Sequence, residues 1–593
     1  MRLSRLTLLL TACAVTALAA PVSAQDAVPL ESPAGPAAEE PAEPATVPIP
    51  AVWAPVPVDA AGQSAYGLYL SGLLASYRGD YTRGTDLLAQ SQSLVPEQPR
   101  VGFDTFRAGL LAGDLDVIVR ISPELLSDPE LADASRLAGA VFAVQRGDAK
   151  SGLAILDSGD FDPAFALAAR LMRAPVAAAA NDWTSALRPV SLSTSDPVTL
   201  ILLHQHARLL ETRRRYAEAE AAFQTLLEVP IATQLFARDY ADFLKRRGRN
   251  AEALAYYRRV LDSVSPTGAD TAAEARELLQ TRPPAAPTAT ELAAQGLRYA
   301  AIFLGPNPEA RSHVVAYLRM AEALHDDDEI ALQLGQVLAA GTQQDEARAA
   351  FERVSPDNPV RYSEAQFGIG LSHASEQRPI EALAAFQRAN RAAPGDAQVL
   401  RLLAIQLKDL GRHEEALAAI DDPSANAARG QPEIREIRGL TLQELGRIEE
   451  AEAELWAALQ AAPDNASLLN SLGYIWVDTG RRVEQGAEML ARAHAAEPEN
   501  GSIQDSLGWA RFRQGQYDIA VETLEGAVSK EPASAEINDH LGDAYWQVGR
   551  RREAQWQWNR VLTLEPDAER RAEVEQKLAN GLSIAPPVAA GQF

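Results

Sequence analysis

The sequence predicts an all-α protein in which paired helices stack into a solenoid, and three observations lead to this prediction. The chain has 593 residues, far more than the roughly 250 to 300 at which a single hydrophobic core stops growing. Hydrophobic residues make up 47% of the chain but aromatic residues only 6%, which suits closely packed helices better than strands. A period of about 34 residues runs through the C-terminal half, and such periods are typical of stacked repeats.

Small residues and prolines mark this period. The small residues that open equivalent contexts are 34 or 35 positions apart, at Gly370, Ala404, Gly439, Gly473, Gly508 and Gly542. The prolines that close the units have the same spacing, at Pro463, Pro498, Pro532 and Pro566. We expect each small residue to let the first helix of a pair approach the second, and each proline to stop the second helix. Left-handed glycines are expected to end first helices at Gly480, Gly515 and Gly549.

The pattern resembles that of the tetratricopeptide repeat family. That family has a Leu-Gly pair followed three positions later by an aromatic residue, then Ala-x3-Phe, then proline. The matching positions are Leu472-Gly473 with Trp476, Leu541-Gly542 with Tyr545, Ala382 with Phe386, Ala347 with Phe351, and Ala554 with Trp558. Arg511 departs from the pattern, since an aromatic residue is usual there, and one extra residue lengthens the turn at 481–483. The resemblance implies an α-solenoid of helix-turn-helix repeats.

The repeats differ in clarity along the chain, and this suggests a division into domains. The units are clearest over 397–566, convincing over 328–394 and weaker over 65–96 and 197–264. Pro283-Pro284, in a stretch rich in Thr, Ala and Pro, cannot continue a helix. We therefore expect two solenoid segments joined by a loop or hinge: a degenerate helical segment over 60–280, a linker over 281–290 and a repeat array over 291–580. One uninterrupted superhelix is the alternative.

The N-terminus has the features of an export signal. Arg2 and Arg5 precede an apolar stretch over 6–20 and a small-residue cleavage site at Val22-Ser23-Ala24. These features predict a signal peptide over 1–24 and a periplasmic protein. The alternative is lipidation at Cys13, which follows Leu10-Thr11-Ala12 and would tether the protein to the outer membrane.

Residues 25–59 are rich in Pro, Ala and Glu, and they and the tail over 581–593 are expected to be disordered. The first of these segments is either a spacer or, around Trp53, a docking strip. Cys13 is the only cysteine, so cleavage after Ala24 would leave no thiol for a disulfide or a metal.

The sequence shows no catalytic constellation. It lacks the zinc, nucleophile-elbow and phosphate-loop motifs, and its net charge of -25 disfavours nucleic acid as a partner. His204 and His206 lie two positions apart and would point in different directions from a helix, so we expect no shared metal. The acidic run 326–329 is expected to start a helix rather than to bind calcium. We therefore expect no enzyme activity, no cofactor and no metal.

Repeat geometry identifies the surface on which partners would bind. First helices line the inner side of such stacks, and exposed aromatic residues are typical of binding hot spots. The expected partner-binding groove consists of Asn470, Tyr474, Asp505, Trp509, Phe512, Asp539, Asp543 and Trp546. The alternative is that these residues pack between neighbouring units. Because the set is acidic and aromatic, we expect a basic or extended apolar ligand rather than the carboxylate clamp of some family members.

The order of export signal, Pro-rich segment and repeats is similar to that of bacterial cell-envelope repeat proteins, among them adaptors of carboxyl-terminal processing proteases. This resemblance implies a non-catalytic periplasmic scaffold or adaptor that binds proteins or peptides and delivers substrates to an envelope protease. The alternative is a structural or polysaccharide-binding component of an envelope export or assembly machine. A membrane is expected as a partner only if Cys13 is lipidated.

Overall fold

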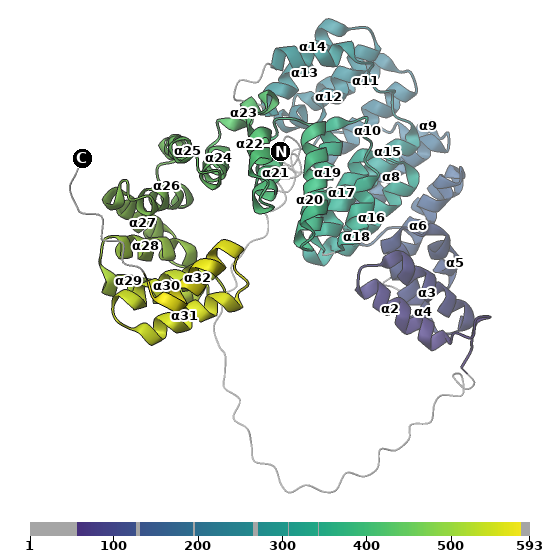
Figure 1. Ribbon diagram of the computed structural model, residues 1–593. Coiled ribbons are helices and arrows are strands. Elements are labelled where there is room, and N and C mark those ends of the chain that lie inside the picture. The colour runs from purple at the N-terminus through teal and green to yellow at the C-terminus, as the bar shows by residue number, and fades with distance from the viewer. Residues whose placement is uncertain are drawn as a thin grey trace, which may run out of the picture. The chain divides into compact units, whose positions relative to one another are not determined.

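The computed structural model describes residues 56–125, 131–193, 196–264, 271–305, 307–341 and 343–582. Apart from an isolated bridge between Val58 and Ser64, the regular structure of these residues is helical (Figure 1). This confirms the all-α prediction. The predicted signal peptide, Cys13, most of the Pro-rich segment and most of the tail lie outside the described residues. Among those described, no helix is long and apolar enough to cross a membrane.

The chain divides into two compact units, Met1–Ser372 and His373–Phe593, and the division falls in the last turn of α19. The helices up to that point are α2 (Ala65–Tyr77), α3 (Tyr81–Leu94), α4 (Pro99–Ala112), α5 (Leu115–Leu125), α6 (Ala132–Gln145), α7 (Ala149–Leu156), α8 (Pro163–Ala179), α9 (Trp183–Ala186), α10 (Val198–Thr212), α11 (Tyr216–Leu227), α12 (Pro230–Arg246), α13 (Asn250–Val264), α14 (Thr271–Gln280), α15 (Ala289–Leu304), α16 (Arg311–Leu324), α17 (Asp328–Ala340), α18 (Gln344–Glu352) and α19 (Pro359–Ser375), with the 3-10 turn η2 (Pro308–Ala310).

The second unit continues with regular helix pairs. Its helices are α20 (Pro379–Ala392), α21 (Ala397–Asp409), α22 (His413–Asp421), α23 (Asn426–Arg429), α24 (Pro432–Glu444), α25 (Ile448–Ala461), α26 (Ala466–Asp478), α27 (Val483–Ala496), α28 (Gly501–Arg513), α29 (Tyr517–Lys530), α30 (Ala535–Gln547), α31 (Arg551–Thr563) and α32 (Ala568–Asn580), with the 3-10 turn η3 (Pro423–Ala425).

The periodic glycines occupy the positions that the sequence predicts. A Cβ atom on Gly508 would lie 2.6 Å from Leu524 Cγ, and one on Gly542 would lie 2.5 Å from Trp558 Cδ1. Side chains of the second helix therefore fill the space that each glycine leaves on the first. Left-handed glycines follow the first helices at Gly480, Gly515 and Gly549, with φ of 68°, 75° and 86°. The tight pairing of helices thus follows from the repeat pattern.

The first unit departs from a simple succession of neighbouring pairs. Helix α15 packs on α8, and α16 packs on α4 and α6 (Figure 1). Residues 281–288 form the expected non-helical loop between α14 and α15. This loop lies inside the first unit, however, because the helices after it return along helices that precede it. The contacts therefore place a boundary at 372, within the expected array over 291–580.

Apolar burial and polar contacts hold the returning helices. Leu292 and Leu297 of α15 and Leu171 of α8 are fully buried. Gln205 Nε2 donates to the backbone oxygens of Leu171, at 3.1 Å, and of Leu292, at 3.3 Å. Farther along, Arg319 Nε donates to Leu111 O at 3.2 Å. The return path is therefore fixed by core packing and by hydrogen bonds from side chains to the backbone of the facing helices.

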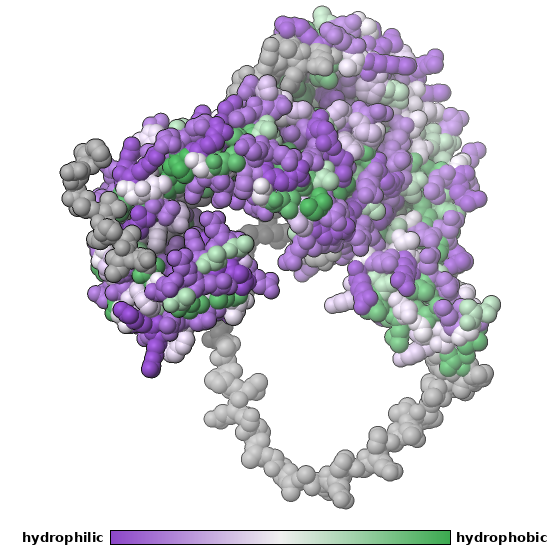
Figure 2. Space-filling model, in the orientation of Figure 1, coloured by the Kyte–Doolittle hydropathy of each residue, from purple (hydrophilic) through white to green (hydrophobic). Residues whose placement is uncertain are grey.

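Most of the visible surface is hydrophilic, as the net charge suggests, but hydrophobic residues gather over α2 to α4 (Figure 2). On α2 the exposed apolar side chains include Leu70, Leu74 and Tyr77, which lie three or four positions apart and so share one face of the helix.

The crossing of α15 and α8 yields a stability prediction. A Cβ atom on Gly296 would lie 2.9 Å from Leu171 O, which is backbone and cannot move aside alone. We expect Gly296→Ala to lower stability by up to about 2 kcal/mol, because overpacking costs about 1–3 kcal/mol and the gain in helix propensity offsets about 1 kcal/mol. Gly102→Ala is the matched control, since no atom lies within 4 Å of its Cβ position. Thermal unfolding followed by circular dichroism compares the two, and equal shifts in Tm would contradict the packing argument.

Candidate protein-binding face

The first helices of the last four pairs, α24, α26, α28 and α30, form one continuous face, which we call the first-helix face. Ser467 Oγ of α26 donates to Glu436 Oε1 of α24 at 2.5 Å. Tyr474 Oη of α26 donates to Glu536 Oε1 of α30 at 3.3 Å. Tyr474 and Glu536 thus meet past the intervening α28. Because side chains two helices apart can meet only on the inner side of a curve, the first-helix face is concave.

An aromatic stack lies on α28 and α30. The Trp509 ring lies 4.8 Å from the Phe512 ring and 4.3 Å from the His540 ring, with interplanar angles of 8° and 14°. Trp509 and Phe512 are half-buried. Trp509 Nε1 also donates to Asp478 Oδ1 of α26 at 3.4 Å. The rings therefore join three first helices and still expose apolar surface on the face.

His540 carries a buried positive charge beneath Trp509. Its Nδ1 lies 3.0 Å from both carboxylate oxygens of Asp505, which is 4% exposed. Burial opposes the charge, but the charge and hydrogen bond of Asp505 outweigh this effect and raise the pKa of His540 to about 9. At neutral pH the stack therefore contains an imidazolium, whose charge the Trp509 ring favours.

The final helix, α32, neutralises two of the predicted groove carboxylates. Lys577 Nζ donates to Asp539 Oδ1 at 2.7 Å and to Asp543 Oδ2 at 2.9 Å. Trp558 Nε1 donates to the other oxygen of Asp543 at 3.0 Å. Both aspartates are buried, and burial raises the pKa of Asp543 to about 6 in spite of Lys577. These carboxylates act inside the fold and do not present charge to a ligand.

The predicted groove residues thus fall into two groups. Asp505, Asp539 and Asp543 are buried in internal ion pairs. The half-buried residues Asn470, Tyr474, Trp509, Phe512 and Trp546 offer part of their surface. The Asn470 Oδ1 atom is buried and has no hydrogen-bond partner, whereas Trp546 packs against the Trp558 ring at 5.3 Å and lies under the Arg551 guanidinium.

The sequence reasoning missed three carboxylates of the face, Glu436, Asp478 and Glu536. The side chains of Asp478 and Glu536 are 49% and 46% exposed, while Glu436 is half-buried beside Ser467. A signal was present, because Glu536 occupies the repeat position of Ser467 and Ser502, at steps of 35 and 34 residues. Asp478 lies 3.7 Å from Arg513 Nη1 and Glu536 lies 3.6 Å from Arg570 Nη2, so a basic ligand would share these two carboxylates with an arginine.

Two other clusters have structural roles. His204 is fully buried, with Nε2 3.0 Å from Asp239 Oδ2, and its ring stacks on Phe236. In the acidic run, Asp327 caps α17 by accepting hydrogen bonds from the backbone of Glu329 and Ile330, which confirms that the run starts a helix. Within the described ranges, no group of three or more His, Cys, Asp and Glu side chains could hold a metal ion.

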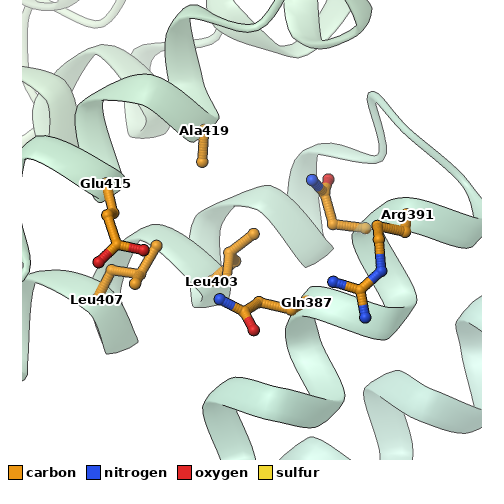
Figure 3. A pocket seen from close by; sticks show the side chains of 7 residues that line it. Gln387, Arg391, Leu403, Leu407, Glu415 and Ala419 are labelled. Atoms are coloured by element: carbon orange, nitrogen blue, oxygen red, sulfur yellow. The ribbon is translucent and has the colours of Figure 1, made fainter.

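A shallow pocket of about 180 Å³ opens among α20, α21 and α22 (Figure 3). Leu403 and Leu407 supply its apolar surface, and Gln387, Arg391 and Glu415 supply polar groups. Small-molecule sites usually measure about 300–1,000 Å³, so this pocket can hold one side chain of a partner rather than a whole ligand.

Comparison with known families agrees with the repeat geometry. A tetratricopeptide repeat model matches residues 204–266, 332–397, 438–503 and 506–568. These four segments, which make up less than half of the chain, are similar to tetratricopeptide repeats. Such repeats mediate protein–protein interactions, and proteins built from them are typically non-catalytic scaffolds. No curated protein matches the sequence at a significant level.

Several solved structures match parts of the chain at low sequence identity and with TM-scores below 0.5. A tetratricopeptide repeat protein from Parabacteroides merdae ATCC 43184 is 15% identical, with 43% of this chain and 99% of that chain covered and a TM-score of 0.37. A chain of the Cut9–Hcn1 hetero-tetramer of APC/C is 14% identical, with 87% of this chain and 96% of that chain covered and a TM-score of 0.36. MamA from Desulfovibrio magneticus RS-1 is 22% identical, with 29% of this chain and 96% of that chain covered and a TM-score of 0.25.

The ion pairs of α32 predict a large loss of stability on removal of one cation. Lys577→Met leaves Asp539 and Asp543 without their lysine, and breaking a buried pair in this way costs about 3–5 kcal/mol. Lys150→Met is the control, since Lys150 is exposed. Urea unfolding followed by tryptophan fluorescence measures both. The defect should shrink at pH 5, because a protonated Asp543 needs no cation, and a defect equal to that of the control would refute the assignment.

The His540–Asp505 pair predicts an unusual titration. We expect the His540 imidazole to titrate near pH 9 in the native protein and below 6.5 in Asp505→Asn, where burial is opposed only by the more distant carboxylates. The raised pKa stabilises the fold fully below about pH 6.5, the unfolded value, and this contribution disappears as the pH rises through 9. Imidazole NMR signals, assigned with His540→Gln, provide the measurement. Titration of native His540 near or below 6.5 would contradict the ion pair.

Proposed function

We propose that this protein is an exported scaffold whose second unit binds segments of other proteins along the first-helix face. The observation that carries the proposal is the partly exposed stack of Trp509 and Phe512 on a concave face that several repeats share. Aromatic rings of this kind dominate the energetics of protein interfaces. The supporting comparison is with a family that mediates protein–protein interactions.

The charges of the face favour a partner segment that contains Lys or Arg among apolar residues. Asp478 and Glu536 are exposed beside the rings of Trp509 and Tyr474. A cation placed there would meet both a carboxylate and an aromatic ring. The cations near the face are paired, Lys577 with Asp539, Arg513 with Asp478 and Arg570 with Glu536. A basic ligand would compete with the two arginines for Asp478 and Glu536. A ligand with a free carboxylate therefore fits this face less well than a basic one.

The cellular setting belongs to the same proposal. The features of residues 1–24 support export to the periplasm and cleavage after Ala24, with lipidation of Cys13 as the alternative. In that setting the scaffold would bring envelope proteins to an assembly or to a processing protease. Mass spectrometry of the mature N-terminus distinguishes a free chain that begins at Gln25 from a lipidated one that begins at Cys13.

The binding face can be tested by site-specific photo-crosslinking in the periplasm. A photoreactive residue at Ser502, exposed on α28, should form adducts with a defined set of proteins, whereas one at Glu522, exposed on the second helix α29, should not. Tyr474→Ala with Trp509→Ala should abolish these adducts, because each buried aromatic residue contributes about 1.5–3 kcal/mol, or about tenfold or more in Kd.

The matched control is Trp556→Ala, since Trp556 is 68% exposed on the second helix α31. It removes a tryptophan but leaves the first-helix face intact, so the adducts should persist. Adducts that survive the double variant would refute the face. Purified peptidoglycan fragments that bind the native protein but not the double variant, in the absence of protein adducts, would point instead to the polysaccharide-binding alternative.

A further inference from the structure

A larger cavity, of about 490 Å³, lies wholly within the first unit, among α7, α8, α9 and α10. Its origin is a shortened second helix. Helix α9 has 4 residues, whereas the second helices before and after it, α7 and α11, have 8 and 12. The chain from 187 to 197 is not helical over its described residues, 187–193 and 196–197. A wall that other pairs complete with a full helix therefore stays open beside α8.

Three arginines line this cavity in a strongly acidic protein, and they differ in their pairing. Arg170 Nη1 and Nη2 each lie 3.1 Å from Asp196 Oδ2. Arg173 Nε lies 2.8 Å from Asp157 Oδ1. Arg188 is exposed and has no hydrogen-bond or ion-pair partner for its side chain among the described residues. Arg188 is therefore the one of the three arginines without an ion pair in the described part of the chain, although it interacts at longer range with Asp182.

The rest of the lining combines one polar ring with apolar surface. His206 is half-buried, its Nδ1 atom is buried without a partner, and burial lowers its pKa. The neutral ring has one N–H donor, and a bound ligand decides which of the two ring nitrogens carries the proton. Leu153, Val190 and Leu202 add apolar surface. The cavity thus has one unpaired cation, one unsatisfied ring and an apolar wall, within the size range of small-ligand sites.

We infer that this cavity binds a single carboxylate attached to an apolar body, with Arg188 pairing with the carboxylate and His206 donating a hydrogen bond to the ligand. An arginine fork matches a carboxylate in geometry, and a single arginine without an ion pair suits a monoanion better than a dianion such as phosphate. The same chemistry occurs in a free organic acid and in the C-terminal end of a polypeptide. The site is independent of the first-helix face, so either proposal can fail alone.

Isothermal titration calorimetry of the full mature protein tests the inference. The probes are 4-phenylbutyrate for a free acid and acetyl-Ala-Leu-Val with a free C-terminus for a chain end. Each is compared with its neutral amide. We expect at least one of the two carboxylates to bind at least tenfold more tightly than its amide, and the tighter of the two identifies the source.

Variants connect the binding to the cavity. Arg188→Ala should weaken the carboxylate at least tenfold, and circular dichroism should be unchanged because Arg188 is exposed. Arg282→Ala removes the same charge from another exposed position of this unit and should leave Kd unchanged. Three results would overturn the inference: no binding by either carboxylate, equal binding by the amides, or equal Kd in Arg188→Ala and the native protein.

Discussion

Close contact between the two helices of each pair is the constraint on which the rest of the structure depends. Where Gly508 and Gly542 face Leu524 and Trp558, no Cβ could fit without displacing a core side chain. This contact uses one side of every first helix and orients its opposite side to the inner surface of the curve. Tyr474, Trp509 and Glu536 share a face because the same small-residue contact recurs every 34 or 35 residues.

Much of the second unit could therefore be predicted from the sequence. Spacing alone located the helix crossings, the left-handed glycines and the prolines, since each depends on contacts within one pair or between adjacent pairs. The return of α15 and α16 along α8 and α4 could not be predicted in this way. It depends on contacts such as that of Gly296 with Leu171, which lie 125 residues apart and follow no period. The sequence predicted a loop at Pro283-Pro284 but did not predict that the helices after this loop pack on α8, α4 and α6.

The candidate face was predicted less completely than the fold, for an electrostatic reason. Position within the repeat identified Asp539 and Asp543 as residues of the inner side, and they do lie on α30. Their state depends on α32, which follows the last periodic pair and brings Lys577 to them. Asp539 and Asp543 are buried with a lysine at 2.7 to 2.9 Å and belong to the core, whereas Asp478 and Glu536 are half exposed beside an arginine and belong to the surface. Sequence position alone does not distinguish the two.

The same reasoning applies to the arginines of the cavity in the first unit. Asp and Glu number 80 against 55 Lys and Arg, and Arg170 and Arg173 are each paired with a carboxylate. Arg188 has no ion-pair partner among the described residues and lies at the cavity, so its guanidinium can pair with an anion there. The shortening of α9 removes the helix that would otherwise cover the site. The repeat pattern thus accounts for the helical wall, and its local interruption accounts for the cavity in which Arg188 lies beside apolar side chains.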